Sequence, residues 1–134
     1  MYKNKRDESL TEVIGACLND LAYLLIFDKE DVSYDLTGAR EALVELKQTV
    51  PKDKWKRFYP EYLHTEAAIE YYEVLQGLSQ SNDPALLKTK LLFAKRDIEA
   101  AIQVLPKKLY MTLRKDIDHA LNLLETGLER FLQG

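Results

Sequence analysis

The sequence predicts an all-α protein, an up-and-down bundle of four long helices plus one shorter helix, in a single domain over residues 1–134. Three observations support this prediction. Apolar residues recur at helical spacing from residue 9 onward, and no stretch shows the period-two alternation of a half-buried strand. Glycine and proline are scarce, with five and four residues, so long uninterrupted elements are expected. The connections between periodic segments are short, which favours antiparallel packing of consecutive helices.

The first helix is predicted to begin at Ser9, because S-L-T-E from Ser9 to Glu12 has the form of a capping box. We expect residues 1–8 to be disordered. The apolar stripe of this helix is expected to face the core, and its members are Leu10, Val13, Ile14, Cys17, Leu18, Leu21, Leu24 and Leu25. After a polar connection, a second and shorter helix is predicted over residues 35–50, and Pro51 closes it.

Three further helices follow in the same manner. Residues 52–60 are predicted to form one helical turn before a third helix over residues 60–79. Asp83–Pro84 predicts the start of a fourth helix, because it places a capping residue before a proline at the first helical position. Pro106 is expected to break that helix, and the last one runs over residues 106–133.

Composition narrows the classes of function. The formal net charge of −3 and the isoelectric point near 5.5 argue against broad nucleic-acid binding. Cys17 is the one cysteine, which excludes an internal disulfide and a cysteine-based zinc site. The longest apolar run, at residues 21–27, is far shorter than the roughly 18 residues of a membrane helix. The N-terminus lacks the apolar segment of a secretory signal.

The predicted topology brings the connection at residues 51–60 and the corner at Pro106 to the same end of the bundle. We expect a basic and aromatic cap there, and aromatic and arginine side chains are enriched at protein interfaces. The candidate partner-binding residues are Lys52, Lys54, Trp55, Lys56, Arg57, Tyr59, Tyr62, Lys107 and Lys108. The alternative interpretation is that Trp55 and Phe58 simply plug the end of the bundle.

Two pairs of residues have the spacing of a metal site. Glu61 and His64 form E-x-x-H, and Asp116 and His119 form D-x-x-H on another helix, as in ferritin-like di-iron proteins. Only His64 lies on the inward face of its predicted helix, whereas His119 points away from the apolar stripe. We therefore expect a partly buried His64, no metal site and no cofactor, and we interpret Cys17 as an inert core residue.

A catalytic alternative comes from a looser pattern. Residues 114–119 fit the R-x4-6-H spacing of HEPN-type ribonucleases, which are also small helical bundles, and residues 57–64 fit it too. Two matches in one chain show that the pattern has low specificity. Nuclease activity would require Arg114 and His119 to meet in a groove, across a dimer. We expect no catalytic activity and keep the ribonuclease as a third hypothesis.

From Trp55 to the C-terminus the chain resembles the PsbQ-type extrinsic proteins of photosystem II. The similar features are KDKW just before a long helix, the segment AAIEYYEVL, and two further helices. The segment LPKKLYMTLRKDIDHALNLLETG is also similar to the last helix of a related lumenal assembly factor. The chain lacks the proline-rich arm of plant members, is acidic where they are basic, and carries a cysteine. An algal or diatom extrinsic subunit fits these differences better than a plant one.

The resemblance implies a four-helix bundle without chemistry of its own in the thylakoid lumen of the chloroplast. Such a subunit docks on the lumenal side of photosystem II, stabilises the oxygen-evolving manganese cluster and helps retain calcium and chloride. We expect a protein partner, no nucleic acid, no membrane insertion and a monomer in isolation, with the basic cap as the docking surface. The second hypothesis is a general helical adaptor or regulatory protein in a soluble compartment such as the cytoplasm.

Overall fold

The structure, a computed structural model, describes residues 2–27, 35–56, 58–79 and 83–133, and it describes side-chain surroundings within 10–26, 35–56, 58–76 and 83–127. Over these backbone ranges the chain forms five α-helices and one short 3₁₀ helix, without a strand. The predicted all-α class, with four long helices and one shorter helix in bundle-like packing, is confirmed.

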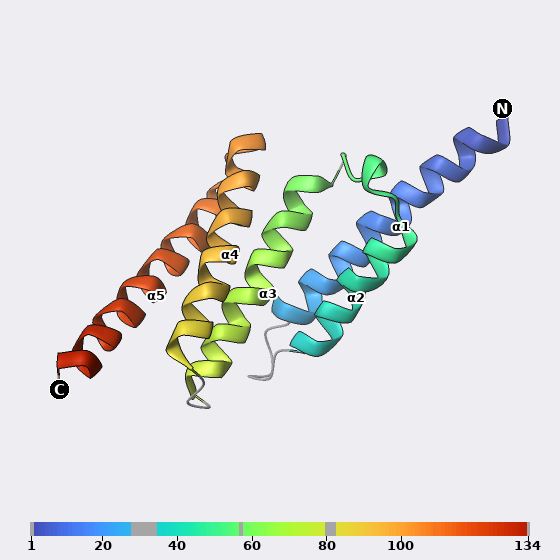
Figure 1. Ribbon diagram of the computed structural model, residues 1–134. Helices are drawn as coiled ribbons and strands as arrows, with labels where there is room; N and C mark the ends of the chain where they lie inside the picture. The colour runs from blue at the N-terminus through green and yellow to red at the C-terminus, as the bar shows by residue number, and fades with distance from the viewer. Residues whose placement is uncertain (1, 28–34, 57, 80–82, 134) are drawn as a thin grey trace.

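The helices run alternately up and down along the molecule (Figure 1). They are α1 (Tyr2–Phe27), α2 (Leu36–Thr49), η1 (Lys52–Lys54), α3 (Tyr59–Ser79), α4 (Pro84–Val104) and α5 (Lys108–Gln133). The main departure from the prediction is at the N-terminus, where α1 begins at Tyr2 instead of Ser9. The predicted capping box therefore lies within the helix, and residues expected to be disordered are helical from Tyr2 onward.

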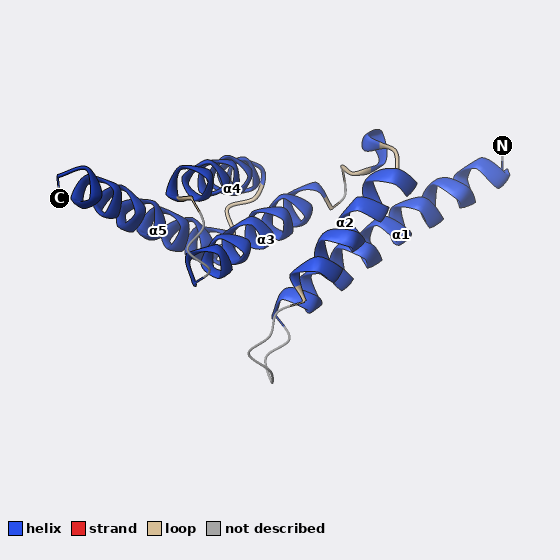
Figure 2. Ribbon diagram, turned by 60° about the horizontal axis from the view of Figure 1, so that its bottom comes forward, coloured by secondary structure: helices blue, strands red, loops and turns tan. Residues whose placement is uncertain are grey.

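The helices lie in an open row instead of a closed ring. The most extensive packing joins α3 to α4, followed by α1 to α2 and α4 to α5. Among the described residues, the α1–α2 pair meets the rest of the molecule chiefly through α3, and Figure 2 shows this pair spreading away from the α3–α5 group. One face of α1 is therefore left without a helix neighbour.

The ends of α2 and α4 form where the sequence predicts them. Asp35 caps α2 by accepting a hydrogen bond from the Gly38 backbone N–H at 2.9 Å. The Asp83 carboxylate accepts one from the Ala85 N–H at 3.0 Å, and Pro84 is the first residue of α4. That helix ends at Val104, before Pro106. Side-chain caps and proline thus fix the corners that bring α3, α4 and α5 side by side.

The inward faces of α2 and α4 agree with the prediction. Apolar residues at helical spacing predict the core faces of these two helices. Of these residues, Ile102 is partly buried and Leu105 is exposed, and the structure buries Leu36, Ala39, Leu43, Leu46, Val50, Leu87, Leu91, Ala94, Ile98 and Ala101. On α5 the buried side chains begin with Tyr110 and continue through Leu113 and Ile117, whereas Leu109 is exposed. Helical spacing also predicts Leu128 and Phe131 as core residues of α5, and both lie outside the residues whose side chains are described.

The predicted inward face of α1 is wrong. The buried residues of this helix are Gly15, Asn19, Ala22 and Ile26, and the predicted stripe points outward, with Leu18 and Leu25 partly buried. Cys17 is exposed and is not the core residue that its apolar neighbours suggested. Small residues decide the orientation, because a Cβ atom at Gly15 would lie 2.6 Å from Cζ of Phe58. Close approach at Gly15 thus outweighs the larger apolar side chains.

Two glycine-to-alanine substitutions test this packing. Gly127 lies on α5 with no neighbouring atom within 4 Å of an added Cβ, so Gly127→Ala should stabilise the protein by up to ~1 kcal/mol through helix propensity. Gly15→Ala gains the same propensity but must displace the buried Phe58 ring, so we expect a net loss of about 1 kcal/mol. Urea denaturation followed by circular dichroism measures both changes. Equal stabilisation by both substitutions would show that α1 is not held by this close approach.

Candidate functional site

The two connections that were expected to form a cap lie at the same end of the molecule, as Figure 1 shows for η1 and for the turn between α4 and α5. The ammonium group of Lys107 lies 3.6 Å from a carboxylate oxygen of Glu61, which is in the first turn of α3. It also lies 5.8 Å from the centroid of the Tyr110 ring. The α4–α5 corner therefore rests against the beginning of α3.

The predicted partner-binding residues divide into exposed and buried groups. Lys52, Lys56, Tyr59, Lys107 and Lys108 are exposed, Lys54 is half-buried, and Arg57 lies outside the described residues. Trp55 and Tyr62 are only 6% and 3% exposed. These two side chains belong to the core, and their direct contact with a partner stays a prediction.

Trp55 closes the end of the protein beside α2. Its indole N–H donates a hydrogen bond to the backbone carbonyl of Val50 at 2.8 Å. The indole ring packs against Tyr62 and Phe58, with centroids 4.8 and 6.5 Å away. Such aromatic contacts, together with burial, hold the turn between α2 and α3 in place. The arrangement agrees with the alternative interpretation, in which Trp55 and Phe58 plug the bundle.

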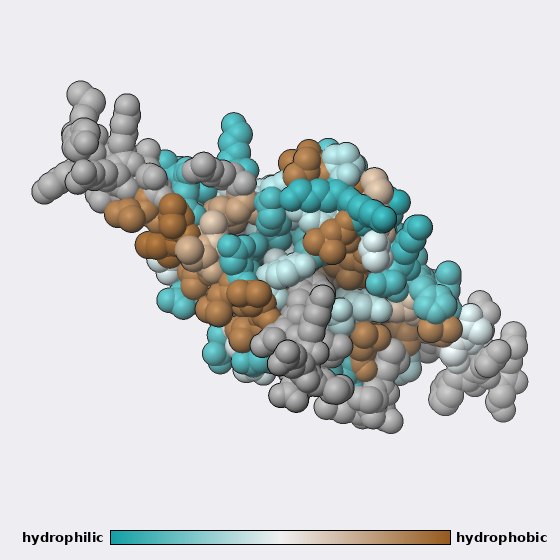
Figure 3. Space-filling model, turned by 180° about the vertical axis from the view of Figure 1, so that it is seen from behind, coloured by the Kyte–Doolittle hydropathy of each residue, from teal (hydrophilic) through white to brown (hydrophobic). Residues whose placement is uncertain are grey.

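The α4–α5 corner carries an exposed apolar group beside lysines. Val104 is 60% exposed and Leu109 is 48% exposed, and Leu105 between them is also exposed. Lys107 and Lys108 occupy the same turn and are exposed as well. We call residues 104–109 the corner surface. Seen from behind, Figure 3 shows brown apolar side chains next to teal hydrophilic ones where α4 turns into α5. Sequence periodicity had assigned Leu105 and Leu109 to the core, but Tyr110 occupies the inward position.

A groove of about 500 Å³ begins at η1 and continues between α2, α3 and α4. Lys52, Trp55 and Tyr59 line it near η1, and Glu66 of α3 and Asp97 of α4 line it as well. Lys47 on α2 borders it as well and lies 3.3 Å from a carboxylate oxygen of Glu66. The predicted cap is thus continuous with an acidic group that the sequence analysis did not predict.

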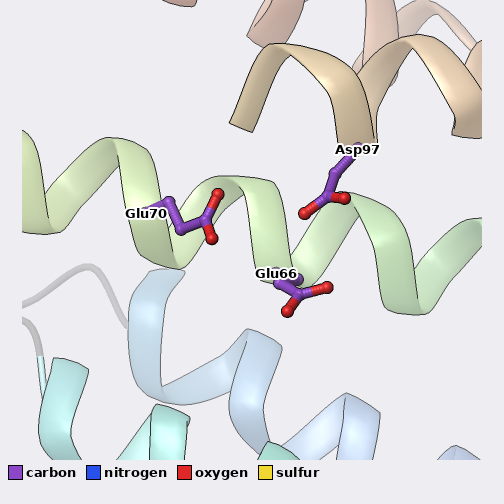
Figure 4. A group of neighbouring side chains, drawn as sticks. All are labelled: Glu66, Glu70 and Asp97. Carbon is purple, nitrogen blue, oxygen red and sulfur yellow. The ribbon is translucent and has the colours of Figure 1, made fainter. Parts of the chain in front are cut away.

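This acidic cluster consists of Glu66 and Glu70 on α3 and Asp97 on α4, each half-buried (Figure 4). One carboxylate oxygen from each residue lies within 4.8 Å of the others. Burial, followed by the charges of Asp97 and Glu66, raises the pKa of Glu70 to about 8. Burial and the adjacent Glu66 carboxylate raise the pKa of Asp97 to about 7. The cluster therefore holds protons near neutral pH.

Carboxylate oxygens are also ligands for hard divalent cations, so these three residues are the described group most suited to hold a metal ion. The expectation of no metal site rested on the histidine pairs and overlooked this group. Glu66 and Glu70 are four residues apart and share a helix face, which the sequence does reveal. The position of Asp97 opposite them depends on the packing of α4 on α3, which the sequence does not reveal.

The two residue pairs with metal-site spacing, Glu61/His64 and Asp116/His119, do not form a common site. His64 is almost fully buried between the rings of Tyr23 and Tyr110, with centroids 5.8 and 5.0 Å away. Burial, together with the charge of Lys107, lowers its pKa to about 4, so the ring is neutral at pH 7. Asp116 and His119 are exposed on α5. His64 therefore packs as a core residue, as the sequence analysis favoured over a di-iron site.

The two residues of the main ribonuclease match, Arg114 and His119, both lie on α5. Arg114 is partly buried and His119 is exposed on the same helix, and neither lines any of the cavities described here. The other match, which begins at Arg57, has its arginine outside the described residues and its histidine in the core. The ribonuclease hypothesis requires two copies of the chain, so the arrangement within one copy does not test it.

A cavity of about 180 Å³ lies beside His64. It is lined by Asn19, Tyr23, Glu61, Lys107 and Tyr110 among others. Among the described side chains, the buried Asn19 carbonyl oxygen and the Tyr110 hydroxyl have no protein hydrogen-bond partner. Burial raises the pKa of Tyr110 to about 12, so the hydroxyl keeps its proton. A cavity of this size has room for ordered water, which satisfies such groups.

No family model, curated protein or solved structure matches this chain. None of the described helices is long and apolar enough to span a membrane. A functional assignment therefore depends on the surfaces and side chains described above, of which the corner surface combines exposure, apolar area and charge.

Proposed function

We propose that the protein is a non-catalytic helical subunit that docks on a protein partner through the corner surface. One observation carries the proposal: Val104, Leu105 and Leu109 are exposed beside Lys107 and Lys108 at a corner fixed by Pro106. Apolar side chains surrounded by charged ones have the composition of a protein interface, with burial at the centre and polar groups at the rim.

Charge supports the choice of this end of the molecule. The chain is acidic overall, with a net charge of −3, yet Lys52, Lys56, Lys107 and Lys108 are exposed at one end. A partner with an apolar patch edged by carboxylates would be attracted by these lysines and then held by burial of the leucines. Trp55 contributes indirectly, because its buried ring fixes the turn that presents Lys52 and Lys56.

The resemblance to PsbQ-type proteins makes the lumenal surface of photosystem II the first partner to test. Docked there, the protein would stabilise the manganese cluster and help retain calcium and chloride in the thylakoid lumen. The same surface also suits a helical adaptor in another soluble compartment. Binding of the wild-type protein to photosystem particles separates these two hypotheses, because only the first requires it.

The test reverses the charge of two corner lysines. In Lys107→Glu/Lys108→Glu, the rim repels the acidic partner, and we expect the affinity for salt-washed photosystem II particles to fall roughly tenfold or more. The matched control is Arg96→Glu/Lys115→Glu, which makes the same charge change at exposed positions on α4 and α5. Circular dichroism checks that both variants keep their helices. Equal binding by the two double variants would contradict docking through the corner surface.

A further inference from the structure

The outward face of α1 carries an apolar stripe with the spacing of a coiled coil. Leu10, Ile14, Cys17, Leu21 and Leu24 follow one another at alternating intervals of four and three residues. All five side chains are exposed, and the exposed fractions of Leu10 and Leu24 are 58% and 61%. Figure 3 shows brown side chains gathered over α1 on this side of the molecule. Alternation of four and three is the heptad pattern by which one helix packs against another.

The stripe cannot turn inward without losing the contacts that seat α1. Gly15 lies on the opposite face, where an added Cβ atom would meet Phe58 at 2.6 Å and Val50 at 3.3 Å. Ala22 and Ile26 on that face are fully buried. Rotation of α1 would replace these fitted residues by leucines at a site with no room for them. The stripe is therefore an external feature of the folded chain.

We propose that two copies of this chain associate through their α1 stripes to form a two-fold symmetric dimer. The heptad pattern indicates the partner of the stripe. A heptad stripe packs against a helix with the same period, and a second copy of the chain supplies such a helix. Ile14 in one layer and Leu10 and Leu24 in the alternate layers form the combination that favours two-stranded pairing, while Leu21 and Cys17 occupy the other two positions of the stripe. A two-fold axis pairs the same surface on both copies, so the association closes at the dimer.

The size of the stripe sets the strength of the dimer. From Leu10 to Leu24 it extends about 21 Å along the helix axis. Two strips of this length bury roughly 1,000 Å² in total, which is the lower limit for a specific interface. We therefore expect a micromolar dimer that dissociates on dilution. Dimerisation buries a contiguous apolar surface of a kind that monomeric proteins rarely expose to solvent. The expectation of a monomer assumed that the stripe lies in the core.

The test follows molecular mass against concentration by sedimentation velocity, over roughly 1–300 µM of the full chain. The wild type should shift from monomer to dimer, and Ile14→Lys/Leu21→Lys should stay monomeric. Leu92→Lys/Phe93→Lys on α4 is the matched control, because it adds the same charge at equally exposed apolar positions and should dimerise as the wild type does. Circular dichroism confirms that all variants fold, since every substituted position is exposed.

Cys17 provides a second readout, because it lies in the middle of the stripe and is the chain's one cysteine. In the wild type and in the α4 control, alkylation of Cys17 by iodoacetamide should slow several-fold as the concentration of reduced protein rises. In the α1 variant the rate should not change with concentration. A wild type that remains monomeric at every concentration would overturn the dimer, as would lysine variants of α1 that associate normally. Loss of association in the α4 control to the same extent would overturn the assignment to α1. Docking through the corner surface is independent of either result.

Discussion

Trp55→Ala is expected to lower the free energy of unfolding by about 3–5 kcal/mol, the usual cost of removing a buried tryptophan side chain. The indole is 6% exposed and packs on Tyr62 and Phe58. Its removal leaves a cavity at the junction between α2 and α3. It also leaves the Val50 carbonyl without the hydrogen bond that the indole N–H donates. Urea denaturation followed by circular dichroism measures the loss.

Two further variants separate the contributions of Trp55. Trp55→Phe keeps most of the apolar volume but removes the N–H donor, so a loss of roughly 1–2 kcal/mol is expected. Tyr59→Ala truncates a neighbouring aromatic residue that is exposed, and should cost about 1 kcal/mol or less. If Trp55→Ala costs no more than Tyr59→Ala, then Trp55 does not plug the bundle.

Glu70→Gln is expected to stabilise the protein at alkaline pH and to have little effect at pH 5. The folded state raises the pKa of Glu70 to about 8, through burial and the nearby carboxylates of Asp97 and Glu66. Between the unfolded pKa of 4.5 and the folded value, the folded chain binds more protons than the unfolded chain. The contribution of Glu70 is therefore fully present below pH 4.5 and is lost as the pH rises through 8. Glutamine resembles the protonated form at every pH.

The magnitude is limited by solvent, because Glu70 is only half-buried. With this screening we expect Glu70→Gln to be more stable than the wild type by about 2 kcal/mol at pH 9. Burial lowers the pKa of His64 to about 4, so this residue destabilises the fold as the pH falls below 6.5. Both proteins contain His64, so its contribution cancels when the free energy of unfolding of the wild type is subtracted from that of the variant at each pH.

Thermal and urea denaturation of both proteins at several pH values from 5 to 9 measure the effect of Glu70. Glu45→Gln on α2 is the matched control, because Glu45 is exposed and is not part of the acidic cluster. Its pH profile should follow that of the wild type. A Glu70→Gln protein whose stability falls between pH 6.5 and 9 as steeply as the wild type would show that the cluster does not retain protons.

Hydrophobic periodicity predicts the buried face of α2 but not that of α1, and the difference has a physical cause. On α2 the larger apolar residues also form the buried face, so periodicity identifies Leu43 and Leu46 correctly. On α1 the most apolar face and the buried face are different, because Gly15 and Ala22 permit close packing while Leu21 and Leu24 remain exposed. Hydrophobic periodicity scores each residue by the hydrophobicity of its side chain. It therefore cannot detect that a glycine, which has no side chain, lets a helix pack closely on that face.

The candidate site was predicted in part for similar reasons. Chain topology places η1 and the α4–α5 corner at one end, which is enough to expect exposed lysines such as Lys52 and Lys108. It does not distinguish an aromatic side chain that faces a partner from one that fills the core, so Trp55 and Tyr62 were assigned to the surface. Contacts between helices, such as Asp97 of α4 with Glu66 of α3, depend on a register that only the folded structure defines.

The open row of helices has a consequence for how the protein unfolds. Because α1 and α2 are joined to the remainder mainly at α3, the chain contains two units whose cooperativity depends on that single seam. The bidentate pair between Arg40 and Glu73, at 2.6 and 3.1 Å, lies across the seam, and the Trp55 turn is at one end of it. We therefore expect the α1–α2 pair to separate at this seam before α3 and α4 do, with a lower free energy of local opening.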